Sequence, residues 1–292
     1  MRTELLADKS LHQSHYGPVR LPVALFFILC LGFSFNALAQ LPTERRCLPP
    51  SAGSASLQQQ IEIQSRRLSS SDVEERRCAA MSLGWMNRAD SSRAAVPALR
   101  DSASIVRATA TRAVLSLPGD EAAAHLLPLL NDRNEFVRQE TAYALGETHS
   151  RQATARLLTI LEKEKMDSVR GAAVVALGLI RDETAVVPLT QILDLRVNRR
   201  KKNENEFVRR AAAVALGQIG SRAAVPALIA ALADERAPND VRREAARALG
   251  LIGDSTAIAP LRSVLASPDP YLSRIAYEAL LKISPAEATR PT

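Results

Sequence analysis

The chain has 292 residues, of which 38 are Lys or Arg and 31 are Asp or Glu, giving a formal net charge of +7. This excess is modest, and its ordinary explanation is solubility; the alternative is attraction of anionic lipid, glycan or acidic protein surfaces. Hydrophobic residues make up 47% and aromatic residues only 4%. Because much of the apolar content is alanine, the composition favours a thin core between closely packed helices.

Residues 1–39 are predicted to be a secretory signal peptide. Arg20 precedes an apolar run over residues 21–39, and the small-x-small triplet Ala37-Leu38-Ala39 ends it. These parts are typical of a signal peptide, with cleavage before Gln40. The alternative is a signal anchor, because the run is close to the ~20 residues that span a bilayer. Either way the rest of the chain is expected to leave the cytoplasm, to the periplasm or the exterior, which excludes nucleic acid as an ordinary partner.

Residues 40–69 are predicted to be an amino-terminal segment that ends in a capping helix, from about Ser54 to Leu68. Loss of the signal peptide leaves two cysteines, Cys47 in this segment and Cys78 in the region that follows. Two cysteines in an oxidising compartment are expected to pair. The alternative is a buried, inert Cys78 and a free Cys47.

Residues 70–284 contain a repeated phrase. Its copies are separated by 31, 31, 32, 39 and 33 residues, and they are Glu75-Arg76, Val106-Arg107, Val137-Arg138, Val169-Arg170, Val208-Arg209 and Val241-Arg242. Most copies continue into an Ala-rich run ending in Leu-Gly, and a second apolar segment follows each one. This period predicts an array of helix pairs. The predicted units are 70–101, 102–132, 133–164, 165–203, 204–236 and 237–267, with a half-unit over 268–284 and a frayed tail over 285–292.

The fifth unit shows how each pair is expected to fold. Val208, Ala212, Ala215 and Ile219 recur at spacings of four, three and four, which places them on one face of a helix. Gly220 is expected to end that helix with a left-handed backbone, as is Gly253 in the next unit. A proline near the start of the second helix is predicted in five units, at Pro97, Pro128, Pro188, Pro226 and Pro260, whereas the third unit has Arg156 at this place. The recurrent Leu-Gly glycine predicts close approach between helices.

The pattern V-R-x-x-A-x-x-A-L-G followed by A-V-P-x-L resembles HEAT-like repeats of the phycobilisome-lyase type. The segment from Val208 through Gly217, followed by Ala224-Val225-Pro226, matches it closely. The resemblance covers residues 70–284 and implies an all-α solenoid, a right-handed superhelix of about six helix pairs with caps. The second unit departs from the pattern, with Val114-Leu115 in place of Leu-Gly, and a local packing adjustment is expected there.

In this family the recurrent arginine is expected to form a structural ladder. Its acidic or amide partners are expected near the starts of neighbouring helices, at Asn134, Asp167, Asn205, Asp240 and Asp269. A binding stripe is the alternative. The arginine ladder consists of Arg76, Arg107, Arg138, Arg170, Arg209 and Arg242.

Relatives with this repeat include bilin lyases and the di-iron enzyme deoxyhypusine hydroxylase, so an enzyme or enzyme-assembly factor is an alternative function. The hydroxylase needs paired His-Glu motifs, because iron requires converging imidazole and carboxylate ligands. The chain has no His-Glu dipeptide, and its only histidines after residue 39 are His125 and His149. A bilin lyase would require a cytoplasmic pigment system. The sequence therefore predicts a scaffold without catalytic residues, cofactor or metal.

Two surfaces are predicted to bind a partner. The second helices of successive units are expected to line a concave face that holds a protein or peptide. The 39-residue interval contains a basic loop that is expected to dock an anionic surface such as a membrane. The alternative is an ordinary solvated loop. Its basic residues are Arg196, Arg199, Arg200, Lys201 and Lys202.

Overall fold

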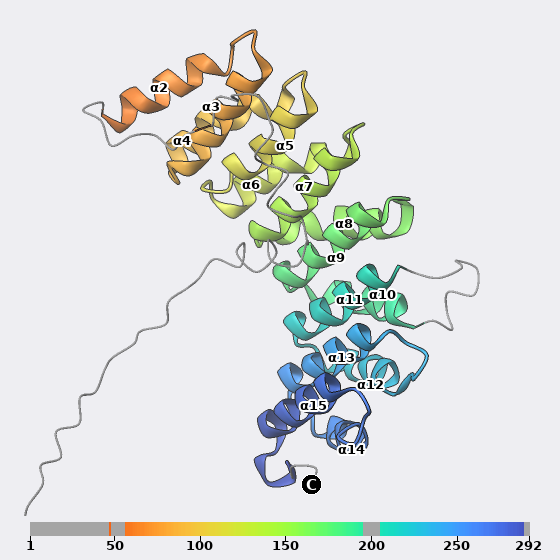
Figure 1. Cartoon of the computed structure of the whole chain (residues 1–292). Helices are drawn as coiled ribbons and strands as arrows, with labels where there is room; N and C mark the ends of the chain where they lie inside the picture. Colours follow the sequence, from red (N-terminus) through yellow and green to blue (C-terminus); the bar gives the residue numbers. More distant parts are fainter. Residues whose placement is uncertain (1–46, 48–55, 195–204, 289–292) are drawn as a thin grey trace, which may run out of the picture. The chain divides into compact units, whose positions relative to one another are not determined.

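The computed structural model describes residues 47, 56–194 and 205–288, which contain fourteen α-helices, several short 3₁₀ helices and no strand (Figure 1). The chain divides into two units at residues 46 and 47, and every described residue belongs to the second. The signal peptide and the basic loop predicted from the sequence lie outside the described residues. None of the described helices is both long enough and apolar enough to span a bilayer.

The first helices of the units form one layer, in which each helix packs against the next in chain order. The positions that recur at helical spacing face the core: Val208 and Ala212 are fully buried, and Ala215 is nearly so. The helices of this first layer are α3 (Val73–Trp85), α5 (Ser104–Ala113), α7 (Glu135–Glu147), α9 (Asp167–Ile180), α11 (Glu206–Ile219), α13 (Asn239–Ile252) and α15 (Pro270–Ile283).

The second helices form the other layer, and each combines an α-helix with a 3₁₀ turn. Helix α12 contacts both α10 and α14, so this layer is also continuous along the chain. Its elements are α4 (Ala89–Ala95) with η2 (Val96–Arg100), α6 (Gly119–Leu126) with η3 (Leu127–Asn131), η4 (Arg151–Ala153) with α8 (Thr154–Lys163), η5 (Glu183–Ala185) with α10 (Val186–Leu193), η6 (Arg222–Ala224) with α12 (Val225–Ala233), and η7 (Ser255–Ala257) with α14 (Ile258–Ser263).

The core between the layers is built mainly from leucine and alanine. The largest fully buried side chains are all leucines, among them the leucines of the Leu-Gly pairs in α3, α7, α9, α11 and α13. Burying one leucine contributes roughly 1.5–3 kcal/mol. The all-α solenoid of helix pairs predicted from the repeat is therefore confirmed.

The predicted proline positions are right in three units and wrong in two. Pro226, Pro188 and Pro260 lie within the first three residues of α12, α10 and α14, where a missing amide donor is tolerated. Pro97 and Pro128 lie instead in η2 and η3, at the other end of the second helix. Proline cannot continue the α-helical hydrogen bonds there, so the chain continues as a 3₁₀ turn.

The Leu-Gly glycines allow adjacent first-layer helices to approach closely. A Cβ atom added at Gly146 would lie 2.7 Å from the Cα atom of Ala176 in α9, and one added at Gly250 would lie 2.7 Å from that of Ala279 in α15. Gly84, Gly178 and Gly217 meet an alanine of the next helix in the same way, at 2.8–3.0 Å. Such distances are shorter than carbon–carbon contacts allow, so this position requires glycine.

The second unit lacks two features that the other five complete units share at the end of the first helix, a Leu-Gly glycine and a following residue of positive φ. The residues of positive φ are Asn87, His149, Arg181, Gly220 and Gly253. The equivalent place in the second unit holds Pro118, whose ring forbids positive φ. Leu115 occupies the glycine place. Helix α5 accordingly ends at Ala113 after 10 residues, whereas the other first helices have 13 or 14.

Additional elements cover both ends of the array. The capping helix expected before the first unit is α2 (Leu57–Arg67), which packs on α3 and α4 and begins with a capping box between Ser56 and Gln59. At the other end, η8 (Pro285–Glu287) packs against α15. The tail that was expected to fray from residue 285 thus begins with an ordered turn, and residues 289–292 lie outside the described part.

Replacing Gly146 by alanine separates packing from helix propensity. Propensity alone would stabilise the protein by about 1 kcal/mol, whereas the overlap with Ala176 is expected to destabilise it by about 1–3 kcal/mol. Urea unfolding followed by circular dichroism measures the difference. Gln191→Ala, at an exposed position of α10, is the control for propensity. An unfolding midpoint for Gly146→Ala equal to or above that of the wild type would contradict the packing account.

Candidate functional site

Three ladder arginines make the same bidentate ion pair. Nε and Nη2 of Arg107 donate to the two carboxylate oxygens of Asp132, at 2.7 and 2.8 Å. Arg76 pairs with Asp101 at 2.6 and 2.9 Å, and Arg138 pairs with Glu164 at 2.8 and 3.2 Å. Each acidic residue directly follows the second helix of its unit. The pair therefore ties the beginning of a first helix to the end of the second helix.

The third arginine nitrogen extends this contact to the loop in front of the first helix. Nη1 of Arg107 donates to the carbonyl oxygens of Asp101 and Ser102, at 2.8 and 3.0 Å. Nη1 of Arg138 donates to the carbonyl oxygen of Asp132 at 2.9 Å. Asp101 and Asp132 thus accept from one arginine through the carboxylate and from the next through the carbonyl. These contacts link successive units without interruption from Arg76 to Glu164.

The pairs are almost excluded from water, with side-chain exposures of 9% for Arg107 and 11% for Asp132. Hydrogen bonds from Arg76 lower the pKa of Asp101, although burial opposes this. Burial raises the pKa of Asp132, but hydrogen bonds from Arg107 and from the Asn134 amide outweigh it, and the net pKa is lowered. Both carboxyls are therefore ionised at neutral pH.

The remaining ladder arginines make different contacts. Nη1 of Arg170 lies 3.4 Å from Oδ1 of Asp167, and Nη2 of Arg209 lies 3.5 Å from the carbonyl oxygen of Leu193. Nε of Arg242 donates to the carbonyl oxygen of Leu232 at 3.0 Å.

Of the five partners expected from the sequence, Asp167 contacts a ladder arginine, Arg170, and the other four have different roles. Asp269 pairs bidentately with Arg243, one residue beyond the ladder position, at 2.8 Å for both bonds. Asp240 also contacts Arg243, at 2.8 Å. The side chains of Asn134 and Asn205 accept backbone amides and cap α7 and α11. The sequence analysis missed the acidic partners in the first three units, although an acidic residue 25 or 26 positions after each arginine was visible.

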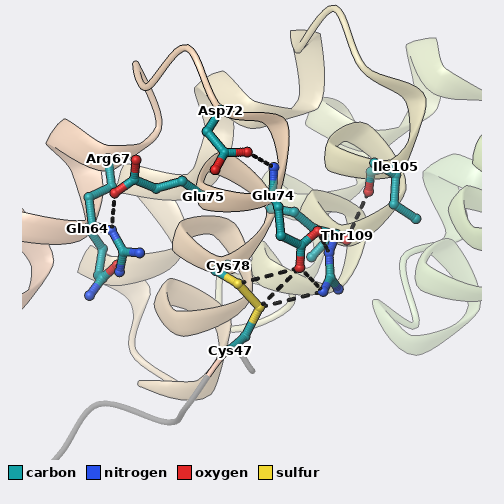
Figure 2. The surroundings of a disulfide bond; sticks show 10 residues. Cys47, Gln64, Arg67, Asp72, Glu74, Glu75, Cys78, Ile105 and Thr109 are labelled. Atoms are coloured by element: carbon teal, nitrogen blue, oxygen red, sulfur yellow. Dashed lines mark hydrogen bonds and ion pairs between the residues drawn. A yellow bond between two sulfur atoms is a disulfide. The ribbon is translucent and has the colours of Figure 1, made fainter. Parts of the chain in front are cut away.

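Cys47 and Cys78 form a disulfide in the structure, across a separation of 31 residues and with their Cα atoms 5.1 Å apart (Figure 2). Oε1 of Glu74 lies 3.8 Å from Sγ of Cys47 and 3.7 Å from Sγ of Cys78, and Nη2 of Arg77 lies 3.5 Å from Sγ of Cys47. Within the described ranges, the two cysteines and Glu74 are the one group with metal-ligand geometry. Because a thiolate is the ligand form of cysteine, the disulfide does not offer that site.

The other residues singled out from the sequence do not converge on a site. His149 has a positive φ, and its Nδ1 atom lies 2.9 Å from the carbonyl oxygen of Leu179. His125 is half-buried in the last turn of α6. The basic loop of Arg196, Arg199, Arg200, Lys201 and Lys202 lies outside the described residues, so the structure does not place it.

At one equivalent position of the second layer the residue is exposed in every unit, and most of these residues are small. Their separations follow the repeat period, and Val187 is 64% exposed. This set, the second-layer stripe, consists of Arg93, Ala124, Ala155, Val187, Pro226 and Ala259. It crosses all six units, with an ion pair between Arg93 and Glu121 at its amino-terminal end.

Comparisons with known sequences agree with the repeat. A model of HEAT repeats matches residues 63–145, 123–204 and 235–291, and a model of the PBS lyase HEAT-like repeat matches residues 208–234. No curated protein matches the chain.

Several solved structures match a large part of this chain. The Escherichia coli protein YibA is 19% identical, with a TM-score of 0.59, and the match covers 93% of this chain and 99% of that one. The CpcE–CpcF complex of phycocyanin lyase from Nostoc sp. PCC7120 is 23% identical, with a TM-score of 0.50 and coverages of 85% and 96%. Human deoxyhypusine hydroxylase is 23% identical, with a TM-score of 0.39 and coverages of 76% and 84%.

Asp132→Asn tests the ladder through its pH dependence. The pKa of Asp132 is below the ordinary 3.8 in the folded protein, so its ionised form stabilises the fold above that pH and this stability is lost as pH falls through the folded pKa. The variant is expected to be less stable by about 2 kcal/mol at neutral pH, with the gap narrowing in acid.

Urea unfolding at a series of pH values measures this gap. Glu147→Gln, in the exposed pair with Arg112, is the matched control and is expected to lose less than about 1 kcal/mol. A gap for Asp132→Asn that is the same in acid as at neutral pH would rule out the assigned role.

Proposed function

Because this chain belongs to the family of HEAT-repeat proteins, we propose that it is an exported, non-catalytic scaffold that binds a polypeptide partner along its second-layer stripe. The observation that carries the proposal is the stripe itself. Small side chains at Ala124, Ala155 and Ala259 leave room for an extended backbone to approach. Val187 supplies exposed apolar area near the middle, and burial of such area drives association. Stacked helix pairs commonly use such extended surfaces for binding.

Export is supported by two independent features of the amino end. The apolar run over residues 21–39 has the parts of a signal peptide. The disulfide between Cys47 and Cys78 fits an oxidising compartment such as the periplasm. Closing a loop of 31 residues contributes about 3–4 kcal/mol in the chain-entropy account, which would hold Cys47 on α3. Retention of residues 21–39 as a membrane anchor is the second possibility for location.

The absence of catalysis in the proposal rests on the ionisable groups of the ladder, which are already held in ion pairs. Asp101, Asp132 and Glu164 each hold two hydrogen bonds from an arginine, and their pKa values are lowered. The pKa of Arg107 is raised by the hydrogen bonds to Asp132. Proton transfer at neutral pH needs a group whose pKa lies near neutrality, and these shifts move the ladder groups away from it.

A second candidate function is an enzyme or an enzyme-assembly factor. The observation that favours it is the similarity to the CpcE–CpcF complex of a phycocyanin lyase over nearly the whole of that chain. A lyase role would require a pigment, and a hydroxylase role would require His-Glu pairs that the sequence lacks. A search for bound pigment or iron in the purified protein therefore distinguishes this candidate from the scaffold.

The test is mild crosslinking and affinity capture of the full chain from its native cells, with intact-mass and metal analysis of the same sample. We expect a mass that begins at Gln40, lighter by the two hydrogens that a disulfide removes, together with a stoichiometric protein partner. Val187→Arg is expected to weaken capture about tenfold, because it charges the apolar middle of the stripe.

Leu251→Arg is the matched control, since Leu251 is 54% exposed on α13 in the first layer, and it is expected to leave capture unchanged. An uncleaved cytoplasmic chain that carries iron or a bilin would overturn both the location and the function. Equal loss with both variants would remove the second-layer stripe from the proposal.

A further inference from the structure

The last ladder arginine has no carboxylate partner among the described residues. Arg76, Arg107 and Arg138 each pair with an acidic residue 25 or 26 positions later. At those distances from Arg242 the chain has Ser267 and Pro268, neither of which is acidic. The contact that Arg242 makes is through Nε, to the carbonyl oxygen of Leu232.

Ser267 occupies the place that the acidic residue holds in the earlier units. Asp101, Asp132 and Glu164 each accept, through a side-chain oxygen, the backbone amide of the residue two positions later. The hydroxyl of Ser267 accepts the amide of Asp269 in the same way, at 3.2 Å. In every case the residue two positions later is the N-cap of the next first helix. The hydrogen bond to the N-cap amide is therefore repeated at Ser267, but Ser267 carries no carboxylate.

A surface pocket of about 390 Å³ opens at this place. The residues that matter for its chemistry are Asn239, Arg242, Arg243, Ser267, Asp269 and Tyr271. Arg243 and Asp269 neutralise each other through their bidentate pair, and the guanidinium of Arg243 lies 5.0 Å from the centre of the Tyr271 ring. Arg242 is thus the positive charge of the pocket that no carboxylate in the described residues balances.

We propose that this pocket, the Arg242 pocket, binds a carboxylate group of a polypeptide partner, which takes the place that Asp101, Asp132 and Glu164 hold in the earlier units. The proposal rests on the proposed scaffold function for the polypeptide nature of the occupant. Charge complementarity selects the ligand, because arginine recognises carboxylates bidentately. The Asn239 amide and the Ser267 hydroxyl add neutral hydrogen-bonding groups beside Arg242, and the exposed ring of Tyr271, at 57%, supplies apolar contact for the adjoining peptide.

The test uses three matched glycine-serine peptides, titrated into the isotopically labelled full chain while the arginine Nε–Hε signals are followed by NMR. One peptide has a central glutamate and an amidated end, one has a free C-terminal carboxylate and no acidic side chain, and one has a central glutamine and an amidated end. A shift of the Arg242 signal with either carboxylate peptide, but not with the glutamine peptide, is expected. Which of the two binds more tightly identifies the source of the carboxylate.

Two pairs of variants make the result specific. Arg242→Gln is expected to weaken binding about tenfold, whereas Arg247→Gln, on the same helix, is expected to leave it unchanged. Ser267→Asp supplies the missing carboxylate from within the chain, so it should abolish peptide binding and raise the unfolding midpoint. Ser267→Asn should not raise the midpoint.

No shift of the Arg242 signal with either carboxylate peptide, or equal shifts with the glutamine peptide, would overturn the proposal. Capture of a partner that Arg242→Gln leaves unaffected would also overturn the pocket while leaving the scaffold function intact.

Discussion

The bidentate pair between a first-helix arginine and the acidic residue after the second helix is the interaction on which the register of the first three units depends. Each complete pair fixes three segments at once: the first helix, the loop in front of it and the loop that follows the second helix. Since the side chains are about 10% exposed, removing one partner would leave an unpaired buried charge, which is costly. The geometry of the ladder is therefore strongly specified even though its net contribution to stability is modest.

Close helix packing supplies the second constraint. The ladder fixes the loop edge, and the glycine–alanine contacts fix the distance between successive first helices, from Gly84 with Ala113 to Gly250 with Ala279. Because each unit contributes mainly leucine and alanine to a thin core, small errors in distance would open voids along a whole layer. The second unit differs locally from the others. Leu115 replaces the Leu-Gly glycine and Pro118 replaces the residue of positive φ, and α5 is shorter, but Arg107 keeps its ladder pair.

Much of the fold could be predicted from the sequence because the same residue pattern recurs in several units, and each copy indicates the same helix pair. The spacing of apolar residues, the close approach at Leu-Gly and the left-handed positions of Gly220 and Gly253 all follow from local rules. Asn87, His149 and Arg181 adopt the same left-handed conformation without glycine. Asparagine and histidine are among the non-glycine residues that adopt it most often, but a single such residue does not mark a helix end in the sequence as glycine does. Pro97 and Pro128 were misplaced because their units begin the second helix earlier relative to the proline.

The candidate site was less predictable than the fold. The arginine ladder was visible as a recurrent residue, but its carboxylate partners follow a helix whose end the sequence did not define, so neighbouring caps such as Asn134 were chosen instead. The Arg242 pocket depends on the absence of an acidic residue at position 267, where the chain has Ser267. That absence can be recognised only after the pairs of the first three units are known.

A double-mutant cycle for Arg107 and Asp132, measured by urea unfolding, tests the central claim most directly. The account predicts a coupling of about 2 kcal/mol or more, against less than about 1 kcal/mol for the exposed pair of Arg112 and Glu147, and a coupling near zero for Arg107 and Asp132 would contradict it.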